Sequence, residues 1–241
     1  MSDSIVIIPT YNEIENIENI IRAVLSLEKS FDILIVDDSS PDGTADVVLK
    51  LADEFPHRLF LEIRAKKSGL GTAYVHGFKW SLAHDYDYIF EMDADFSHNP
   101  LDLKHLYDAC SVGLADMSIG SRYITGVNVV NWPLNRVLMS YFASVYVRFI
   151  TQMQIMDTTA GFVCYSKKVL QAINLDKIKF IGYAFQIEMK YRAFAKNFDI
   201  VEVPIIFTDR AKGQSKMSGS IIKEAVFGVV SLRIKKMLGT L

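Results

Sequence analysis

Short apolar runs alternate with longer amphipathic segments through the first hundred residues, and this alternation constrains the fold more than any other feature. The apolar runs have the length and composition of buried strands and fall at residues 5–9, 32–36, 59–63 and 88–92. Helices are expected between them, ending near residue 25 and spanning 45–55 and 70–83, the first with apolar Ile17, Ile20, Ile21, Val24 and Leu25. Because strands joined by single helices pair in parallel, the pattern predicts an α/β fold, a Rossmann-like, doubly wound, mostly parallel sheet with helices on both faces.

The second half of the chain continues this alternation with longer helices. Further strands are expected at residues 116–120, 161–165 and 200–207, and helices at 135–154, 183–195 and after Gly219. No repeat, low-complexity segment or linker interrupts the chain. Residues 1–219 are therefore interpreted as one domain, followed at 220–241 by an amphipathic helix with Ile222, Val226, Val229 and Val230 on one face.

Three helix starts carry local signals. Asn12, with Glu15 three residues later, resembles a capping box. Asn99 offers an N-cap and Pro100 suits the first turn, so a helix is expected directly after the fourth strand. Residues 69–71 (GLG) are interpreted as a helix entry, because neither the dinucleotide fingerprint nor P-loop spacing occurs in the chain.

Polar clusters follow three of the predicted strands. They are residues 10–13 (TYNE), Asp37 with Asp38, and residues 93–95 (DAD). Parallel α/β sheets bind ligands beyond the carboxyl ends of their strands, so the three clusters predict a binding site there. Two carboxylates spaced as Asp93 and Asp95 offer the oxygen ligands that Mg²⁺ or Mn²⁺ prefers. A lone Asp-x-Asp is more often a solvated loop, by roughly three to one, but the coincidence of three clusters reverses those odds.

The predicted helix at 135–154 carries polar residues at every fourth position. Arg136, Ser140, Ser144 and Arg148 would therefore stack along one line of an otherwise apolar, aromatic helix. Two explanations are equally consistent with this spacing, namely arginines that snorkel at a surface or an anion-binding site.

Composition limits the classes of protein to consider. Half of the 241 residues are hydrophobic, enough for one substantial core. Cys110 and Cys164 do not form a disulfide framework, which favours a cytoplasmic compartment. Neither a signal peptide nor an apolar run of the ~20 residues that span a bilayer is expected. Seven basic residues and only one acidic residue follow Asp209 in a chain of net charge −2, and this basic tail indicates phosphates or an anionic membrane surface.

The motifs resemble those of family-2 inverting glycosyltransferases of GT-A fold. The shared motifs are residues 9–13 (PTYNE), 36–44 (VDDSSPDGT), 93–98 (DADFSH) and 120–123 (GSRY). More narrowly, residues 131–133 (NWP) with Arg136, and residues 210–216 (RAKGQSK), resemble dolichol- and polyprenyl-phosphate mannose synthases. The resemblance covers about residues 5–216. Its first three motifs are common to many sugar transferases, whereas the last two discriminate.

This resemblance implies an enzyme that transfers mannose from GDP-mannose to a polyprenyl monophosphate. It assigns the nucleotide sugar to Pro9, Tyr11, Glu13, Val36, Asp38, Asp93, Ala94, Asp95, Arg210 and Lys216. It assigns a divalent metal, Mg²⁺ or Mn²⁺, to Asp93, Asp95 and Ser97, although some members carry Gln at the position of Ser97. It assigns the acceptor phosphate to Arg122, Arg136 and Ser140. It assigns catalysis to Asp93, Asp95 and Arg122.

Further expectations concern the acceptor and the surroundings of the enzyme. An acceptor phosphate is largely a dianion at neutral pH and needs no strong general base, so His98 is interpreted as structural and Glu188 only as a positioning residue. Peripheral attachment to the cytoplasmic face of a membrane is expected, with a membrane-protein partner among the candidate contacts. No nucleic acid is expected to bind.

Several alternatives remain open from the sequence. The donor could be a UDP-sugar such as UDP-glucose, and residues 93–97 superficially fit the nucleophile motif of haloacid-dehalogenase phosphatases. The pair Asp37 and Asp38 would suit a non-enzymatic, receiver-like domain. Tyr11 could simply pack on the sheet edge, and Asp37 could cap the following turn while only Asp38 contacts ligand. Arg122 could stabilise the fold by pairing with an acidic neighbour.

Overall fold

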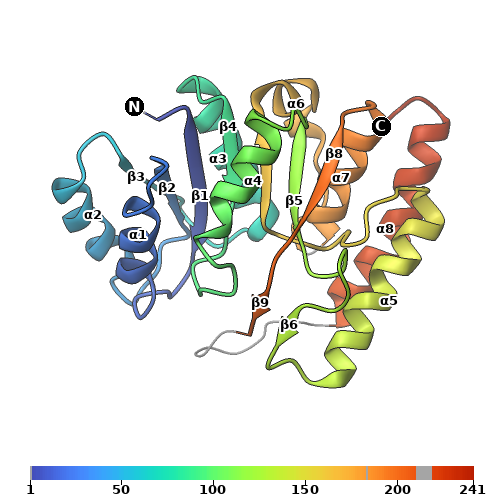
Figure 1. Cartoon of the computed structure of the whole chain (residues 1–241), viewed down its shortest axis with the longest axis horizontal. Coiled ribbons are helices and arrows are strands. Elements are labelled where there is room, and N and C mark those ends of the chain that lie inside the picture. Colours follow the sequence, from blue (N-terminus) through green and yellow to red (C-terminus); the bar gives the residue numbers. More distant parts are fainter. Residues whose placement is uncertain (1, 183, 210–218) are drawn as a thin grey trace.

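A central seven-stranded sheet lies between two layers of helices (Figure 1). The computed structural model describes residues 2–182, 184–209 and 219–241. The strands of the large sheet are β1 (Ser4–Thr10), β2 (Asp32–Asp37), β3 (Leu59–Ile63), β4 (Tyr88–Glu91), β5 (Met117–Ser121), β7 (Val163–Ser166) and β8 (Ile200–Pro204). Their order is β3-β2-β1-β4-β7-β5-β8, and β7 runs antiparallel to both of its neighbours while the other pairs are parallel. The predicted mostly parallel, doubly wound sheet is confirmed.

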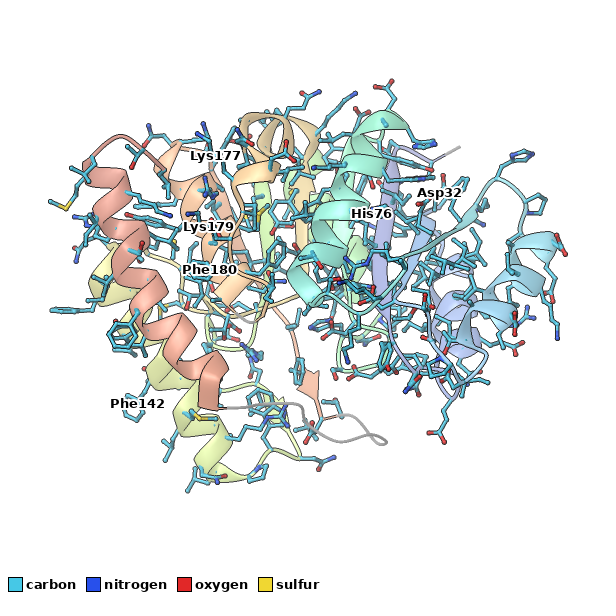
Figure 2. The ribbon with its side chains drawn as sticks, turned by 180° about the vertical axis from the view of Figure 1, so that it is seen from behind. Asp32, His76, Phe142, Lys177, Lys179 and Phe180 are labelled. Carbon is cyan, nitrogen blue, oxygen red and sulfur yellow. The ribbon has the colours of Figure 1, made fainter. Side chains whose placement is uncertain are left out.

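Helices cover both faces of this sheet. One face carries α1 (Ile17–Leu25), α2 (Thr44–Glu54) and α4 (Asp102–Ser111), and the other carries α3 (Leu70–Ala83), α6 (Lys167–Ala172) and α7 (Ala184–Ala195) (Figures 1 and 2). A short 3₁₀ turn, Leu175–Lys177, precedes α7. The two longest helices, α5 (Leu134–Thr151) and α8 (Gly219–Met237), pack on each other beyond β8, and α8 also packs on α7.

The two cores follow from the two-residue period of the strands. On β1, Ile5 and Ile7 face the core beneath α3 and α7, whereas Val6 and Ile8 face the core beneath α1 and α4. These side chains are fully buried, and each contributes about 1.5–3 kcal/mol of burial free energy. A continuous apolar run is therefore what a strand between two helical layers requires.

The predicted strand at residues 200–207 is confirmed for residues 200–204 only, because the chain then passes into a second sheet. It leaves the large sheet after Pro204, and residues 207–208 then pair in parallel with Val129–Val130 (β6) as the short strand β9. Proline has no amide proton to continue a ladder. The departure places the ring of Phe207 against Trp132 and His98.

Two helix starts also differ from the predictions. Helix α1 begins at Ile17, and Asn12 adopts a left-handed conformation with φ 61°, so the predicted capping box is wrong. Helix α4 begins at Asp102, two residues later than expected, because Asn99 Oδ1 accepts a hydrogen bond from Leu101 N in a turn before the helix. The predicted helix entry at Gly69 is confirmed, and its φ of 101° suits a residue without a Cβ.

Helix α8 is apolar on more than one side. Val229 and Leu232 are buried, and Gly228 lies so close to Phe180 that a Cβ there would meet the ring at 2.4 Å. Phe227 and Met237 remain largely exposed. None of the helices in the described part of the chain combines the length and the apolar character needed to cross a bilayer.

Candidate active site

The three polar clusters meet at one edge of the sheet. Strand β1 pairs with β2 on one side and with β4 on the other, so the segments that follow these three strands lie side by side. Hydrogen bonds join the first two segments, from Asn12 N to Ser40 Oγ (3.0 Å) and from Glu13 N to Thr44 Oγ1 (3.1 Å). The expectation that the clusters share the carboxyl edge of a parallel sheet is confirmed.

The two aspartates after β2 have different surroundings. Asp37 is buried and accepts hydrogen bonds from Thr10 Oγ1 (2.8 Å), Ser40 N (2.8 Å) and Ser40 Oγ (2.6 Å). It therefore holds the turn, as the alternative reading expected. Asp38 forms an ion pair with Arg64 at 2.5 Å, and Arg64 in turn donates to Thr72 Oγ1 at 2.8 Å. Arg64 belongs to the same edge and was not predicted from the sequence.

Other residues assigned to the nucleotide are placed at or beneath this edge. Lys67 Nζ lies 4.1 Å from the centre of the Tyr11 ring, a cation–π contact. The side chains of Val36 and Ala94 are buried in the cores, so only their backbone groups could face a ligand. Arg210 and Lys216 lie outside the described residues.

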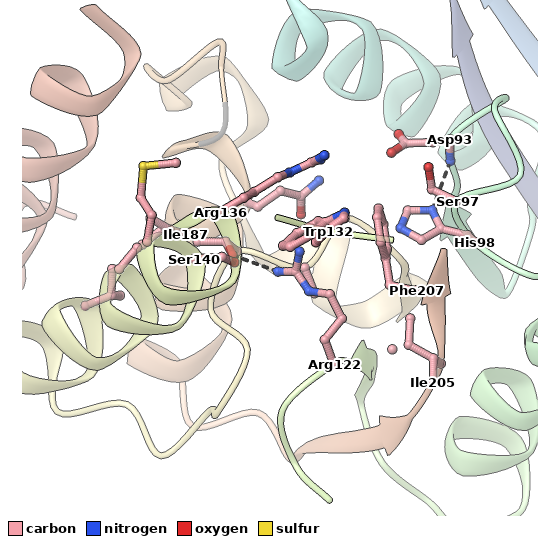
Figure 3. A pocket seen from close by; sticks show the side chains of 18 of the residues that line it. Asp93, Ser97, His98, Arg122, Trp132, Arg136, Ser140, Ile187, Ile205 and Phe207 are labelled. Carbon is pink, nitrogen blue, oxygen red and sulfur yellow. Dashed lines mark hydrogen bonds between the residues drawn. The ribbon is translucent and has the colours of Figure 1, made fainter. Parts of the chain in front are cut away.

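A cavity of about 380 Å³ extends from the Asp93–Asp95 loop to helices α5 and α8 (Figure 3). Asp93, Asp95 and Ser97 line one end, and Arg122, Arg136 and Ser140 line the other. Residues assigned from the sequence to the metal and to the acceptor phosphate thus line one cavity, although Arg136 follows Asp93 by more than forty residues. Ala160, Gly161 and Gln186 also line this cavity.

The carboxylate end is held in place by its neighbours. Ser97 donates from its amide (3.0 Å) and its hydroxyl (2.5 Å) to Asp95 Oδ1, and Asp93 N donates to His98 Nδ1 at 3.2 Å. The His98 ring stacks on Phe162, and burial lowers the pKa of His98 to about 4. A neutral imidazole whose Nδ1 accepts from the backbone is consistent with the structural role expected for His98.

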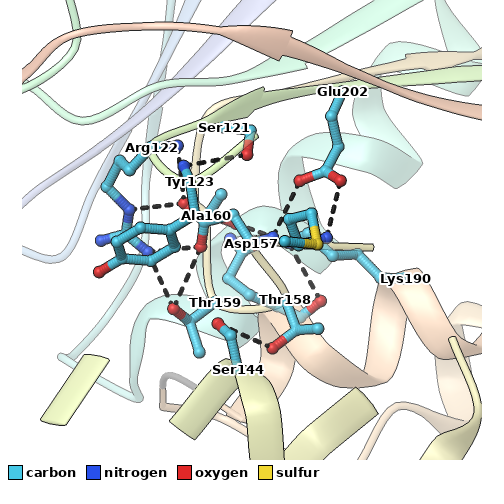
Figure 4. A network of polar contacts seen from close by, with 12 residues as sticks. Ser121, Arg122, Tyr123, Ser144, Asp157, Thr158, Thr159, Ala160, Lys190 and Glu202 are labelled. Atoms are coloured by element: carbon cyan, nitrogen blue, oxygen red, sulfur yellow. Dashed lines mark hydrogen bonds and ion pairs between the residues drawn. The ribbon is translucent and has the colours of Figure 1, made fainter. Parts of the chain in front are cut away.

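Arg122 is held by a buried acid (Figure 4). Asp157 accepts hydrogen bonds from Arg122 N (3.0 Å), Nε (2.6 Å) and Nη2 (2.6 Å), and Thr159 Oγ1 accepts from Nη2 at 2.9 Å. Burial alone would raise the pKa of Asp157, but the charge and hydrogen bonds of Arg122 lower it. Glu202 accepts from the amides of Met156 and Asp157 and so fixes the loop that carries the acid. The alternative that Arg122 pairs with an acidic neighbour is confirmed, while Arg122 also lines the cavity.

Helix α5 directs its line of polar residues towards the body of the protein. Arg136 stacks over Trp132 at 4.0 Å and donates from Nη1 to Asp209 Oδ1 at 2.9 Å. Ser144 is buried beside Thr158, and Arg148 contacts Met156. The four-residue spacing therefore marks the side of α5 that faces the protein. Only the first two residues of this line, Arg136 and Ser140, reach the cavity.

Comparison with known proteins decides the family. Residues 5–173, more than half of the chain, match glycosyl transferase family 2. The chain belongs to glycosyl transferase family 2. Polyprenol monophosphomannose synthase of Mycolicibacterium smegmatis is 46% identical over 98% of this chain and 88% of its own length. Undecaprenyl-phosphate mannosyltransferase of Micrococcus luteus is 45% identical over 92% of this chain and 90% of its own.

Further relatives extend the comparison. Dolichol-phosphate mannosyltransferase of Pyrococcus furiosus is 36% identical over 91% of this chain, which spans 60% of that protein's length. Among solved structures, glucosyl-3-phosphoglycerate synthase of Mycobacterium tuberculosis with Mn²⁺, UDP-glucose and phosphoglyceric acid has a TM-score of 0.71 at 16% identity, covering 95% of this chain and 79% of that one. The structural likeness confirms the GT-A fold, and the sequence likeness confirms the resemblance to polyprenyl-phosphate mannose synthases. Neither the phosphatase nor the receiver-like alternative fits this placement.

The carboxylate end of this glycosyltransferase fits a divalent metal shared with a ligand. The described residues contain no group of three or more His, Cys, Asp and Glu side chains that could enclose an ion by themselves. Two aspartates beside a roomy cavity instead match the habit of Mg²⁺ and Mn²⁺, which take one or two carboxylates and complete their shell with phosphate oxygens and water.

Several buried polar residues of this glycosyltransferase escaped the sequence analysis. Asp157 pairs with Arg122 across 35 positions of sequence, a contact that no local pattern encodes. Glu91 and Lys190 are buried behind Gln186, which lines the cavity. A signal for Glu91 was present, because a charged residue inside an apolar strand run is costly unless it has a partner.

Glu188 is buried with Arg192 and accepts from the amides of Lys179 and Phe180, so it organises the turn before α7.

Proposed function

We propose that this glycosyltransferase transfers mannose from GDP-mannose to a polyprenyl monophosphate, with inversion at the anomeric carbon. The observation that carries the proposal is the cavity that has two carboxylates at one end and two arginines at the other. Such a cavity suits a reaction between a metal-bound diphosphate and a second phosphate. The names of the two relatives with about 45% identity support mannose and a polyprenyl phosphate as substrates. The donor GDP-mannose rests on the family resemblance.

On the donor side, the nucleotide would lie along the edge formed by Pro9, Tyr11, Glu13 and Asp38. Asp93 and Asp95, with Ser97 as the third proposed ligand, would hold Mg²⁺ or Mn²⁺, which neutralises a departing diphosphate. In the structure, the Ser97 hydroxyl orients Asp95, so this serine would have to turn to reach a metal. Arg210 and Lys216, outside the described residues, complete the proposed diphosphate contacts.

On the acceptor side, Arg122, Arg136 and Ser140 would bind the phosphate of the lipid. A phosphate whose second pKa is near ~6 is mostly a dianion at neutral pH and can attack without a strong base. This accords with the neutral, backbone-bonded state of His98. The chain's own contribution is therefore to orient two anions and to neutralise their charge while they approach each other.

A polyprenyl acceptor also requires access to a membrane. The cavity is bounded by α5 and α8, whose outward faces expose Phe142 (60%), Phe149 (75%) and Phe227 (74%). We therefore propose that residues 1–219 form the catalytic domain and that the helix at 220–241, together with α5, rests on the cytoplasmic surface of a membrane as an interfacial anchor. The basic residues Lys235 and Lys236 near the end of α8 would favour anionic lipids. A membrane-protein partner could occupy part of the same face.

The proposal is tested with radiolabelled GDP-mannose, undecaprenyl phosphate and Mg²⁺ or Mn²⁺. Label should move into the lipid extract, and removal of the metal or the change Asp95→Ala should abolish this transfer because the diphosphate loses its counter-ion. A parallel reaction with UDP-glucose checks the alternative donor. Release of free phosphate without lipid product, or unchanged metal-dependent turnover by Asp95→Ala, would contradict the proposal.

A further inference from the structure

A buried polar network lies directly under the cavity wall. Glu91 at the end of β4 accepts a hydrogen bond from Gln186 Nε2 and another from Tyr165 Oη at 3.1 Å. Lys190, one turn after Gln186 on α7, donates to Ala160 O at 2.6 Å and to Gln186 Oε1 at 3.4 Å. Glu91 and Lys190 are fully buried, whereas Gln186 lines the cavity.

The two buried charges dictate how the Gln186 amide is oriented. A carboxylate accepts only from the amide nitrogen, and an ammonium donates only to the amide oxygen. Reversal of the amide would place oxygen against oxygen at Glu91 and nitrogen against nitrogen at Lys190. An amide has two N–H donors and two acceptor positions, and each of these contacts uses one. The side chain can therefore offer one donor and one acceptor in a fixed direction.

The buried charges of Glu91 and Lys190 lower the stability of the fold, which a functional role would explain. Glu91 and Lys190 are both fully buried, and taking a charged group out of water carries a desolvation cost. Replacing a buried charged pair with apolar residues often stabilises a protein. The position of the pair, behind a glutamine that lines a ligand cavity, gives it a use other than stability.

Gln186 lines the same cavity as the carboxylates and the arginines, and its partners connect it to both sets. Its partner Glu91 is two residues before Asp93, and its partner Lys190 holds the carbonyl of Ala160, next to the Thr159 hydroxyl that contacts Arg122. The neighbouring Gly161 lies next to the Gln186 amide, since a Cβ on Gly161 would be 3.6 Å from Gln186 Nε2, an ordinary contact distance. In a displacement, the transferred group must lie between the leaving and the attacking oxygens. A cavity-lining side chain connected in this way to both sets of residues is a candidate to contact the sugar ring.

We propose that Gln186 binds a hydroxyl group of the transferred sugar and so helps to determine which nucleotide sugar the enzyme uses, with Glu91 and Lys190 as positioning residues. This inference rests on the proposed function, because it takes the two ends of the cavity to be the diphosphate and acceptor-phosphate sites. A site built to hydrogen-bond a hydroxyl discriminates strongly against ligands that lack it, since its buried polar groups are then left unpaired.

The test compares the binding of GDP-mannose with that of GDP by calorimetry in the presence of Mn²⁺. Gln186→Ala should bind GDP as tightly as the wild type does. Its ratio of GDP-mannose affinity to GDP affinity should be about tenfold lower than that of the wild type. The matched control is Gln154→Ala, because Gln154 is exposed and does not line the cavity. Should Gln186→Ala fail to fold, Gln186→Asn keeps the amide and withdraws it by one methylene, and the same loss is expected.

A series of GDP-deoxymannoses then identifies the hydroxyl. In the wild type, one deoxy analogue should bind more weakly than GDP-mannose, and in Gln186→Ala that analogue and GDP-mannose should bind alike. The assignment is overturned if the ratio of GDP-mannose affinity to GDP affinity is the same in both Gln186 variants as in the wild type. It is also overturned if the wild type binds GDP-mannose and GDP equally well. Lipid product with an unchanged ratio refutes this inference alone. A changed ratio without lipid product refutes the proposed function and leaves the sugar contact standing.

Discussion

Replacing Asp157 with asparagine should destabilise the protein strongly, because it leaves the guanidinium of Arg122 buried without its counter-charge. The asparagine side chain has the same shape but presents one acceptor where Asp157 presents two to Arg122 N, Nε and Nη2. Asp157 is fully buried and Arg122 nearly so, so solvent offers little compensation. Removing one partner of such a buried pair costs about 3–5 kcal/mol. For a chain of this size, the melting temperature should then fall by roughly 6–20 °C.

The same substitution has a pH signature whose direction follows from the pKa. Arg122 holds the pKa of Asp157 below its ordinary value despite burial. An aspartate with a lowered folded-state pKa contributes stability above its unfolded pKa of about 3.9, and that contribution is lost as the pH falls through the folded-state pKa. The difference in unfolding free energy between wild type and Asp157→Asn should therefore stay constant from pH 6 to 8. It should narrow below about pH 4.

Urea denaturation at several pH values measures both quantities, and Asp85→Asn supplies the control. Asp85 also pairs with a cation, Lys167, but this pair is exposed. Its loss should leave the denaturation midpoint at pH 7 unchanged. The reasoning is refuted if Asp157→Asn shifts the midpoint no more than Asp85→Asn does, or if the difference persists undiminished at acid pH.

Three further predictions concern the acceptor phosphate and the membrane surface. Arg136→Ala should weaken binding of the lipid phosphate by about 1.5–3 kcal/mol, while the affinity for the donor stays near that of the wild type. The control Arg148→Ala, further along α5 and outside the cavity, should change neither affinity. An equal loss of nucleotide binding by Arg136→Ala would show that Arg136 is assigned to the wrong substrate. Phe142→Ser with Phe149→Ser should lower binding to anionic vesicles at unchanged GDP affinity, because these exposed rings would no longer enter the lipid surface. Lys235→Glu with Lys236→Glu should remove most of the salt dependence of that binding, and vesicle binding unaltered in both double variants would contradict an interfacial role for α5 and α8.

The fold could be predicted from the sequence because local and global signals agree. The runs at β1 and β2 are apolar on both faces, as strands between two helical layers must be. The polar residues after β1, β2 and β4 could be assembled in advance because parallel pairing brings the carboxyl ends of strands together. The antiparallel direction of β7 and the division of residues 200–207 between two sheets depend on tertiary partners, which a local pattern does not contain.

The charged residues that line the cavity could be singled out from the sequence and Gln186 could not, for a physical reason. Asp93, Asp95 and Arg136 stand out in the sequence because they are charged residues at exposed strand ends or along a helix. Gln186 and Lys190 lie in a helix of which almost every residue is buried, so helical spacing does not separate a ligand-facing side from a core-facing one. Gln186 is singled out by its contact with Glu91, almost a hundred residues earlier, and Lys190 by its contact with Gln186.

The structure also reconciles the two interpretations of Arg122, as a stabilising partner and as a phosphate ligand. A guanidinium has five donors in a fixed plane, and the pairing with Asp157 and Thr159 engages Nε and Nη2. Two parallel hydrogen bonds fix the direction of that plane, which a lysine could not reproduce. Arg122 can therefore present further donors to an acceptor phosphate only in the orientation that Asp157 imposes. Asp157→Asn should accordingly raise the KM for the lipid phosphate even at temperatures where the variant is fully folded, and an unchanged KM in the folded variant would assign Arg122 to stability alone.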